Sequence, residues 1–205
     1  MGNTKETILT TALHLFAQNG YEAVSVSMIA DELGITKGAL YKHYKSKRDI
    51  FNQILARMEQ LDAQRAREFT LPEGTAQEME DAYRKASFRQ LTAFSLAQFR
   101  YWTQEEFPAS FRKMLTLEQY RSAEMNRLYQ QYLAAGPLQY VADLFQAWNM
   151  DAGEADRFYG PMFLFYSVYD GAEDPAAAAR ELEARLIRHW KQWEEAYELH
   201  SQRKL

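Results

Sequence analysis

Apolar residues recur with a helical period along nearly the whole chain. Glycines and prolines interrupt this pattern at intervals typical of the turns in a helix bundle, and no segment alternates with the two-residue period of a strand. The pattern predicts about nine helices, at residues 4–18, 27–33, 37–44, 47–70, 76–104, 109–134 (a break near residue 116 is left open), 138–148, 154–169 and 176–200. We therefore expect an all-α protein in which Ser25, Thr36 and Ser46 cap the second, third and fourth helices.

Composition excludes several classes of protein and indicates the cellular compartment. The 205 residues contain no cysteine, which excludes disulfides and cysteine-based catalytic or metal sites. The longest apolar run, Pro161 to Tyr166, is far shorter than the ~20 residues of a membrane-spanning helix. The first twenty residues include Lys5, Glu6 and His14 and lack the pattern of a signal peptide. These features predict a cytoplasmic protein with no membrane partner.

The net charge of -4 is unevenly distributed. Residues 1–67 hold nine Lys and Arg against seven Asp and Glu, so the rest of the chain is acidic. Within this first part, residues 35–48 contain no acid and five basic residues, Lys37, Lys42, Lys45, Lys47 and Arg48. Such a run on an acidic protein is either an ordinary solvated surface or a contact for a polyanion.

Two short predicted helices around Gly34 have the spacing of a helix-turn-helix motif. Ile29 and Leu33 lie four residues apart on one face of the first helix, and Leu40 of the second returns to the same core. Gly34 can adopt the left-handed conformation that the turn requires. The residues that then remain outward on the second helix are Lys37, Gly38, Tyr41 and Lys42, at the end that a recognition helix presents to base edges.

Further residues of this segment suit a DNA contact. Gly38 lets the backbone approach a duplex, and Thr36, His43 and Lys47 flank the helix where phosphates would lie. The alternative is a helical hairpin whose polar face is only solvated.

The first 50 residues resemble the tetracycline-repressor (TetR) family of transcriptional regulators. The resemblance is carried by Phe16-Ala17-Gln18-Asn19-Gly20-Tyr21, by Ser25-Val26 with Ile29-Ala30, by Gly34 to Tyr44, and by Lys45-Ser46-Lys47. It implies a three-helix DNA-binding domain, here residues 1–48, and a C-terminal helical domain for ligand binding and dimerisation, here residues 49–205. It also implies that the DNA is lined by Ser25, Ser27, Thr36, Lys37, Gly38, Ala39, Tyr41, Lys42, His43 and Lys47.

Two positions differ from the common pattern of that family. Ser27 stands where such proteins often have Arg, so the resemblance assigns base reading mainly to Lys37, Tyr41 and Lys42 of the second helix. Tyr44 stands where Phe is common, and we expect it to pack against the first helix.

Beyond residue 70 the resemblance assigns no particular residues. Between Gln90 and Trp102 the only charged residue is Arg100, so this segment is apolar almost all round and should cross the centre of its domain. Its aromatic residues form either a ligand pocket or an ordinary core. For a pocket, the predicted ligand-binding residues are Phe94, Phe99, Arg100 and Trp102, which suit a flat, aromatic or apolar effector. Arg100 would pair with an anionic group, with Glu105 or solvent as the alternatives; no cofactor is expected.

The last two predicted helices carry apolar stripes that predict a homodimer. Packing both stripes against the same pair from a second copy would build a symmetric four-helix bundle. The predicted interface residues are Phe158, Met162, Phe165, Leu182, Leu186, Trp190 and Trp193. Packing within one chain is the alternative, and it explains one stripe more easily than two.

An enzyme is the main alternative of another class. The four histidines are dispersed, with no glutamate three residues before any of them, and no nucleotide-binding, metalloprotease or serine-hydrolase motif is present. We therefore predict no catalytic and no metal site. The sequence favours a ligand-responsive repressor that binds palindromic double-stranded operator DNA as a dimer. A helical interaction protein without DNA binding is the second interpretation.

Overall fold

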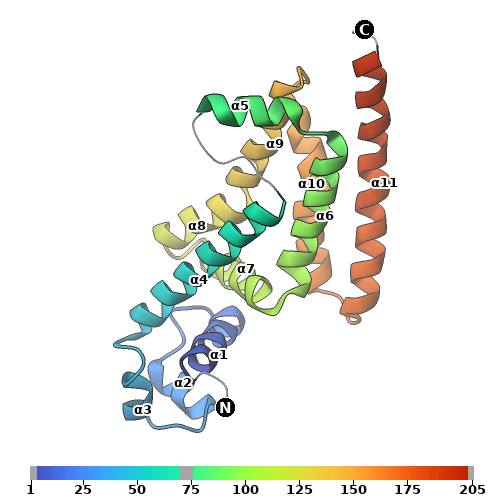
Figure 1. The fold of residues 1–205 in the computed structure, drawn as a ribbon. Coiled ribbons are helices and arrows are strands. Elements are labelled where there is room, and N and C mark those ends of the chain that lie inside the picture. The colour runs from blue at the N-terminus through green and yellow to red at the C-terminus, as the bar shows by residue number, and fades with distance from the viewer. Residues whose placement is uncertain (1–3, 70–75, 203–205) are drawn as a thin grey trace. The chain divides into compact units, whose positions relative to one another are not determined.

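The structure, a computed structural model, describes residues 4–69 and 76–202 (Figure 1). Every regular element in these ranges is an α-helix. The helices are α1 Thr4–Asn19, α2 Val26–Glu32, α3 Lys37–Tyr41, α4 Lys47–Glu68, α5 Ala76–Lys85, α6 Phe88–Gln104, α7 Glu106–Glu118, α8 Ala123–Leu133, α9 Ala135–Ala147, α10 Glu154–Asp170 and α11 Pro175–Gln202. None of them, within the described part of the chain, combines the length and the apolar composition needed to cross a membrane. The predicted all-α fold is confirmed.

The predicted helix 76–104 is divided into α5 and α6. Ser87 caps α6, because its Oγ accepts a hydrogen bond from Gln90 N at 3.2 Å, while its own backbone N donates to Gln90 Oε1 at 2.8 Å. These two reciprocal hydrogen bonds satisfy the backbone N–H groups of Ser87 and Gln90, which the start of a helix leaves without a partner inside the helix. Both partners are polar residues inside an otherwise helical pattern, so periodicity alone did not reveal the break.

Two prolines before which the sequence predicts no helix lie inside the first turns of α7 and α9. Pro108 is the third residue of α7 and Pro137 the third residue of α9, so both helices begin earlier than predicted. The first-turn N–H groups have no partner within a helix, so proline costs little there. The long predicted helix 109–134 does break, but at residues 119–122 rather than at Thr116, whose hydroxyl donates to Arg112 O at 2.9 Å inside α7.

Contacts within the chain define two compact units. Unit 1 comprises residues 1–68 and 106–129, and unit 2 comprises residues 69–105 and 130–205. Unit 1 thus joins α4 and α7 to the helix-turn-helix segment. The domain boundary predicted after residue 48 concerns function and stays a prediction.

Unit 1 is built around α1, which packs along α7 and against α4 (Figure 1). Its buried apolar residues include Ile8, Leu13 and Phe16 of α1, Phe51 and Ile54 of α4, and Phe111, Met114 and Leu115 of α7. Tyr21 lies between Phe16 and Phe51, with ring centroids 5.1 Å from each. The aromatic contact joins the end of α1 to the start of α4.

Unit 2 has an aromatic core formed by α6, α9, α10 and α11. The buried rings of Phe88, Phe145, Trp148, Phe158 and Trp190 contact one another at centroid distances between 5.3 and 6.5 Å. Their polar atoms have partners, since Trp148 Nε1 donates to Tyr83 O at 2.8 Å and Trp190 Nε1 to Phe158 O at 3.2 Å. Buried indoles normally find such acceptors, because an unpaired N–H inside a core is costly.

Candidate nucleic-acid interface and effector site

The turn between α2 and α3 has the geometry that the sequence predicted. Gly34 has φ +64°, and the following Ile35 N donates to Ala30 O at 3.0 Å. Ile29, Ala30 and Leu40 are buried. A left-handed residue without Cβ at this point lets α3 turn back onto the same core.

Two of the predicted DNA-lining residues cap the motif helices. Ser25 Oγ accepts from Met28 N at 3.2 Å, and Thr36 Oγ1 accepts from Ala39 N at 3.2 Å. These bonds use an acceptor position of each hydroxyl and leave its O–H available as a donor. Both side chains are exposed, so they can satisfy the helix and also donate to a phosphate.

The face of α3 opposite the core is open to solvent. Lys37, Gly38, Lys42 and His43 are exposed, and Tyr41 is 50% exposed. Within residues 4–69 and 76–202 the side chains of Lys37, Lys42 and His43 form no hydrogen bond or ion pair, so their charge and donors are available to an outside partner. Ser27 and Ala39 lie beside this face and are half-buried.

Gly38 has no structural need to be glycine. A Cβ built there would meet only Thr36 Oγ1, at 3.9 Å, which is an ordinary contact. Alanine would stabilise α3 more than glycine does, so no contact with the described residues explains the glycine. The predicted backbone approach to a duplex would explain it.

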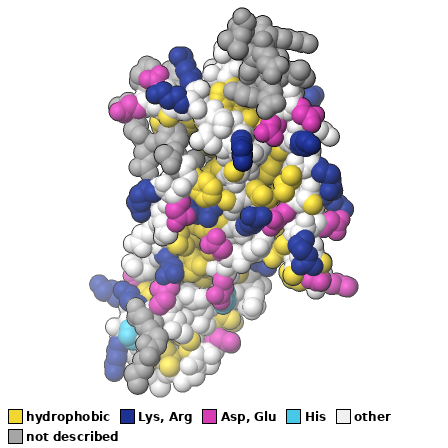
Figure 2. All heavy atoms as spheres, turned by 45° about the vertical axis from the view of Figure 1, so that its right-hand side comes forward, with side chains coloured by type: hydrophobic (Ala, Val, Ile, Leu, Met, Phe, Trp, Pro, Cys, Tyr) yellow, Lys and Arg dark blue, Asp and Glu magenta, His cyan; other side chains and the backbone are white. Residues whose placement is uncertain are grey.

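The basic run from residue 37 to 48 is divided by the fold. Lys37, Lys42 and Lys45 are exposed, whereas Lys47 Nζ donates to Tyr21 O at 2.8 Å and Arg48 forms a two-bond pair with Glu124, 2.6 Å for each bond. The pair raises the pKa of Arg48 and lowers the pKa of Glu124, in each case mainly through the hydrogen bonds between them. Figure 2 shows basic side chains and a histidine together at the lower left, the end at which Figure 1 places α3.

Tyr44 lies where the sequence placed it, against the first helix. Its hydroxyl donates to Lys5 O at 2.9 Å, and its ring is buried. Burial, with the carboxylates of Glu6 and Asp49 adding to it, raises the pKa of Tyr44 to about 12. The phenol therefore stays a neutral donor and belongs to the core of unit 1.

An aromatic cavity of about 240 Å³ lies in unit 2, where α5, α6 and α9 meet the residue after α4. Phe94 borders it, and rings from three other segments surround Phe94: Phe69 at 5.3 Å, Tyr140 at 5.9 Å, and Tyr83 at 5.8 Å from Tyr140. Burial above all, and Tyr83 beside it, raise the pKa of Tyr140, so its phenol remains protonated. The remaining lining residues are Ala82, Lys85, Ala86, Gln90, Leu91 and Leu144.

The other three predicted ligand residues lie elsewhere on α6. Phe99 is stacked on Tyr166 at 5.9 Å, and Trp102 is buried beside Tyr101 and Tyr132. Arg100 pairs with Glu183 of α11 at 2.5 Å. Glu183 comes 83 residues later in the sequence, so sequence spacing could not identify it. Ligand contact by these three residues stays a prediction, and of the four only Phe94 borders this cavity.

Sequence reasoning missed Phe69, Tyr83 and Tyr140 as cavity residues. They come from three helices or turns far apart in the chain, and none stands in a motif. The only signal was composition, since aromatic residues are frequent throughout. Helix packing, not local pattern, brings these rings together.

The predicted dimer residues are mostly covered by their own chain. Phe158, Met162, Leu182, Leu186 and Trp190 are buried, and Phe158 stacks on Trp190 at 5.3 Å. Phe165 and Trp193 are half-buried. The two stripes thus pack against each other and against α6 and α9, the alternative that the sequence made less favourable. An interface on α10 and α11 stays a prediction, but these five residues do not form its surface in this structure.

Other apolar residues of the same two helices are exposed. Leu164 is 59% exposed, Val168 45% and Ile187 51%, and Phe163 is also exposed. In Figure 2 the side of the molecule that carries α11 is turned toward the viewer, and apolar side chains gather there among side chains of both charges. These residues are the available contact surface.

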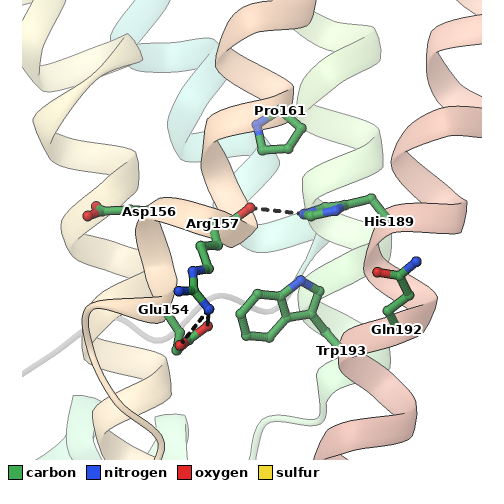
Figure 3. A pocket seen from close by; sticks show the side chains of 7 residues that line it. All are labelled: Glu154, Asp156, Arg157, Pro161, His189, Gln192 and Trp193. Atoms are coloured by element: carbon green, nitrogen blue, oxygen red, sulfur yellow. Dashed lines mark hydrogen bonds and ion pairs between the residues drawn. The ribbon is translucent and has the colours of Figure 1, made fainter.

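A second hollow, lined mostly by charged and polar residues, lies where the first turns of α10 face α11 (Figure 3). Pro161 has no N–H for Arg157 O, and His189 Nε2 lies 2.9 Å from that carbonyl oxygen. Since a carbonyl can only accept, Nε2 carries the proton. Trp193 borders the hollow, and Arg157 pairs with Glu154 at 3.2 Å. His189 therefore replaces the hydrogen bond that proline removes, which explains how Pro161 is tolerated inside α10.

The fold and the solvent-facing second helix define a helix-turn-helix protein with an aromatic helical second unit. Residues 8–54 match the sequence profile of bacterial regulatory proteins of the tetR family. The match covers the helix-turn-helix segment and the start of α4, and it does not extend to the rest of the chain.

Curated relatives match over about 50 residues. The regulator AcrR of Shigella flexneri is 45% identical over 51 residues, which are 25% of this chain and 24% of that protein. The repressor BepR of Brucella suis is 39% identical over 54 residues, 26% of each chain. The match thus spans about a quarter of these relatives' length.

Solved structures are similar over nearly the whole chain. The fatty acid degradation regulator FadR of Bacillus halodurans has a TM-score of 0.57 and 17% identity, covering 91% of this chain and 96% of that one. A protein from Saccharomonospora viridis, solved in complex with choline, has a TM-score of 0.58 and 22% identity, covering 92% and 95%. At these identities the likeness concerns the fold alone.

Proposed function

We propose that this chain is a cytoplasmic repressor that binds palindromic operator DNA as a homodimer and releases it when a small molecule binds to unit 2. The observation that carries the DNA-binding part is the outer face of α3. Its lysines have no partner in the described chain, and Gly38 has open space where a side chain would fit. Matching relatives are named as regulators and repressors of transcription, which supports the same conclusion.

Dimerisation follows from the size of the recognition element. A helix of five residues such as α3 contacts too few bases for a specific site, and a two-fold dimer doubles the contact at half-sites about 34–36 Å apart or a multiple of that. Exposed Leu164, Val168 and Ile187 on the last two helices support such an interface. Single exposed apolar residues are common on protein surfaces, whereas several on neighbouring helices are typical of an interaction site.

The aromatic cavity around Phe94 is the best candidate for the effector site. Its volume suits a small flat molecule, and its surroundings combine aromatic faces with the protonated phenol of Tyr140. A structure of the same fold was solved with choline, and another is described as a gamma-butyrolactone receptor with a TM-score of 0.55. Both support the view that this fold holds small molecules.

Coupling would run through α4, whose last residue, Glu68, is followed by cavity residue Phe69. A continuous helix of 22 residues without glycine or proline transmits movement at one end to the other. Operator DNA must then weaken effector binding by the same factor by which the effector weakens DNA binding, typically about 5- to 150-fold.

The DNA-binding proposal is tested with duplex from the promoter region of the chain's own gene. Lys37→Ala should cost about 1–3 kcal/mol on the operator if Lys37 reads a guanine, and much less on random duplex. Lys191→Ala on α11, also exposed, is the matched control and should change neither affinity. Equal losses on operator and random duplex for Lys37→Ala would contradict base reading.

The dimer and effector proposals are tested together by native mass spectrometry, which reports stoichiometry and any co-purified small molecule. Leu164→Glu should yield monomers, whereas Gln146→Glu, at an exposed position on α9, should not. Phe94→Ala should abolish retention of the small molecule and leave the dimer intact. A wild-type monomer at micromolar concentration by sedimentation would contradict dimerisation.

A further inference from the structure

Lys47 opens α4 at the end of the basic run, where the family resemblance makes it a DNA-lining residue. Its side chain points instead into unit 1. Nζ donates to Tyr21 O at 2.8 Å and to Glu22 O at 3.3 Å, and it lies 4.3 Å from the centroid of the Tyr21 ring. The Glu22 carboxylate is 4.0 Å away. An ammonium group has three N–H donors, and two of them are used by these carbonyls, which leaves the Lys47 side chain 23% exposed.

The two carbonyls that Lys47 holds belong to the turn between α1 and α2. Neither Tyr21 O nor Glu22 O accepts any of the backbone hydrogen bonds formed outside the helices in the described residues. Carbonyls at the end of a helix need a donor, and a lysine can provide one. Lys47 thus ties the first turn of α4 to the segment that leads into the Ser25 cap of α2.

A cation in the first turn of a helix is opposed by the helix dipole, so its position requires a compensating partner. For Lys47 the partners are the two carbonyls, the face of Tyr21 and the Glu22 carboxylate; for the neighbouring Arg48 the partner is Glu124. Asp49 helps by accepting from Lys45 N at 2.8 Å. The cations in the first turn of α4 are thus held by contacts within unit 1, whereas the side chains of Lys37 and Lys42 form no hydrogen bond or ion pair in the described residues.

We propose that Lys47 is a positioning residue of the DNA-binding unit, which sets the α2–α3 motif relative to α4, and that it is not a phosphate ligand. This inference rests on the proposed DNA binding. The duplex is then held by the exposed residues on and after α3, and Lys47 acts on affinity only through the placement of that helix.

The experiment compares Lys47→Met with Lys42→Met, which removes the same charge from an exposed side chain without partners in the described chain. The DNA is a duplex that the wild-type protein selects from a random pool. Three quantities are measured for each protein: the midpoint of thermal unfolding, the affinity at a temperature where circular dichroism shows the protein folded, and the slope of log affinity against log salt concentration.

For Lys47→Met we expect a midpoint lower by about 2–4 °C, an affinity about tenfold weaker, and an unchanged salt slope. For Lys42→Met we expect an unchanged midpoint and a slope smaller by about one, because the variant removes one exposed positive charge from the proposed DNA-binding face. The proposal is overturned if Lys47→Met reduces the slope by about one, whatever its midpoint. It is also overturned if the folded Lys47→Met protein binds as tightly as wild type, because the contact would then only stabilise the fold. Failure of the wild-type protein to select any duplex would instead contradict the proposed function.

Discussion

The two units of this molecule are held together by different physical means. In unit 1 the helix ends are fixed by polar contacts between neighbouring or facing segments, such as the Ser25 and Thr36 caps, the Lys47 contacts and the Arg48–Glu124 pair. In unit 2 the helices are joined by a continuous set of aromatic rings from α6 to α11. Both units have an apolar core, but the orientation of the helix-turn-helix in unit 1 depends on these directional bonds, whereas the shape of the unit 2 cavity depends on the volume and shape of its side chains.

The largest effect should come from removing a ring of unit 2. Trp190→Ala should lower the free energy of unfolding by about 3–5 kcal/mol, because it leaves a cavity beside Phe158 and removes the donor to Phe158 O. Chemical denaturation followed by circular dichroism measures this loss. Ile187→Ala, on the exposed side of the same helix, is the control and should cost less than about 0.5 kcal/mol. Similar losses for the two variants would mean that aromatic packing does not dominate unit 2.

In unit 1 the next largest loss of stability should come from a substitution that strains the backbone, at Gly20. Gly20 has φ +85°, and a Cβ there would lie 2.4 Å from Glu118 Oε1. The Glu118 side chain is 1% exposed, so it cannot move out into solvent without opening the core. Gly20→Ala should therefore cost about 1–3 kcal/mol in thermal or chemical unfolding. An unchanged midpoint would show that the end of α1 adapts more easily than its packing indicates.

Two ion pairs allow the units to be compared by pH. Hydrogen bonds from Arg48 lower the pKa of Glu124 in unit 1, and those from Arg100 and then Gln104 lower the pKa of Glu183 in unit 2. A carboxyl whose pKa is lower in the folded state stabilises the fold above its ordinary pKa of about 4.3, and this stabilisation is lost as pH falls through the folded value. Both contributions are therefore full at pH 7 and disappear in acid.

The expected sizes differ because the exposures differ. Glu183 is 16% exposed and Glu124 36%, so Glu183→Gln should cost about 1 kcal/mol at pH 7 and Glu124→Gln less. Unfolding curves at pH 7 and below pH 4 measure both costs, which should vanish in acid. A cost that persists at low pH would show that the carboxylate charge is not the cause.

The smallest effect should be a gain. Gly38→Ala should raise the stability of the folded protein by about 0.5–1 kcal/mol, since the added methyl group meets open space and alanine favours the helix. The same change should weaken DNA binding if the duplex comes close to the backbone of α3. Thermal unfolding and binding to the selected duplex should thus move in opposite directions. Stabilisation together with unchanged binding would leave Gly38 without a function in DNA contact.

How far the sequence predicted the structure also differs between the two units. In unit 1 the caps, the positive φ of Gly34 and the outward set on α3 were all predicted, because each depends on residues within a few positions of one another. The role of Lys47 was not predicted, because its carbonyl partners lie 25 and 26 residues away in the sequence. The helix starts at Glu106 and Ala135 were missed because proline was taken as a stop where the first turn tolerates it.

In unit 2 the sequence predicted helices and their apolar stripes but not their partners. The sequence favours a second copy as the partner of the stripes containing Phe158 and Trp190, with packing inside one chain as the alternative, and in this structure the two residues stack on each other. An apolar stripe specifies that a helix face is covered but not by what, since hydrophobic packing has no direction and any complementary surface satisfies it.

The sequence by itself determined the all-α class, the helix-turn-helix and the residues exposed on the outer face of α3, because periodicity, caps and a left-handed glycine act over one or two helical turns. Only the tertiary structure decided which cations remain free, which rings surround Phe94, and which apolar residues of α10 and α11 stay exposed. Each of these depends on side chains that are far apart in the chain and meet only when the helices pack.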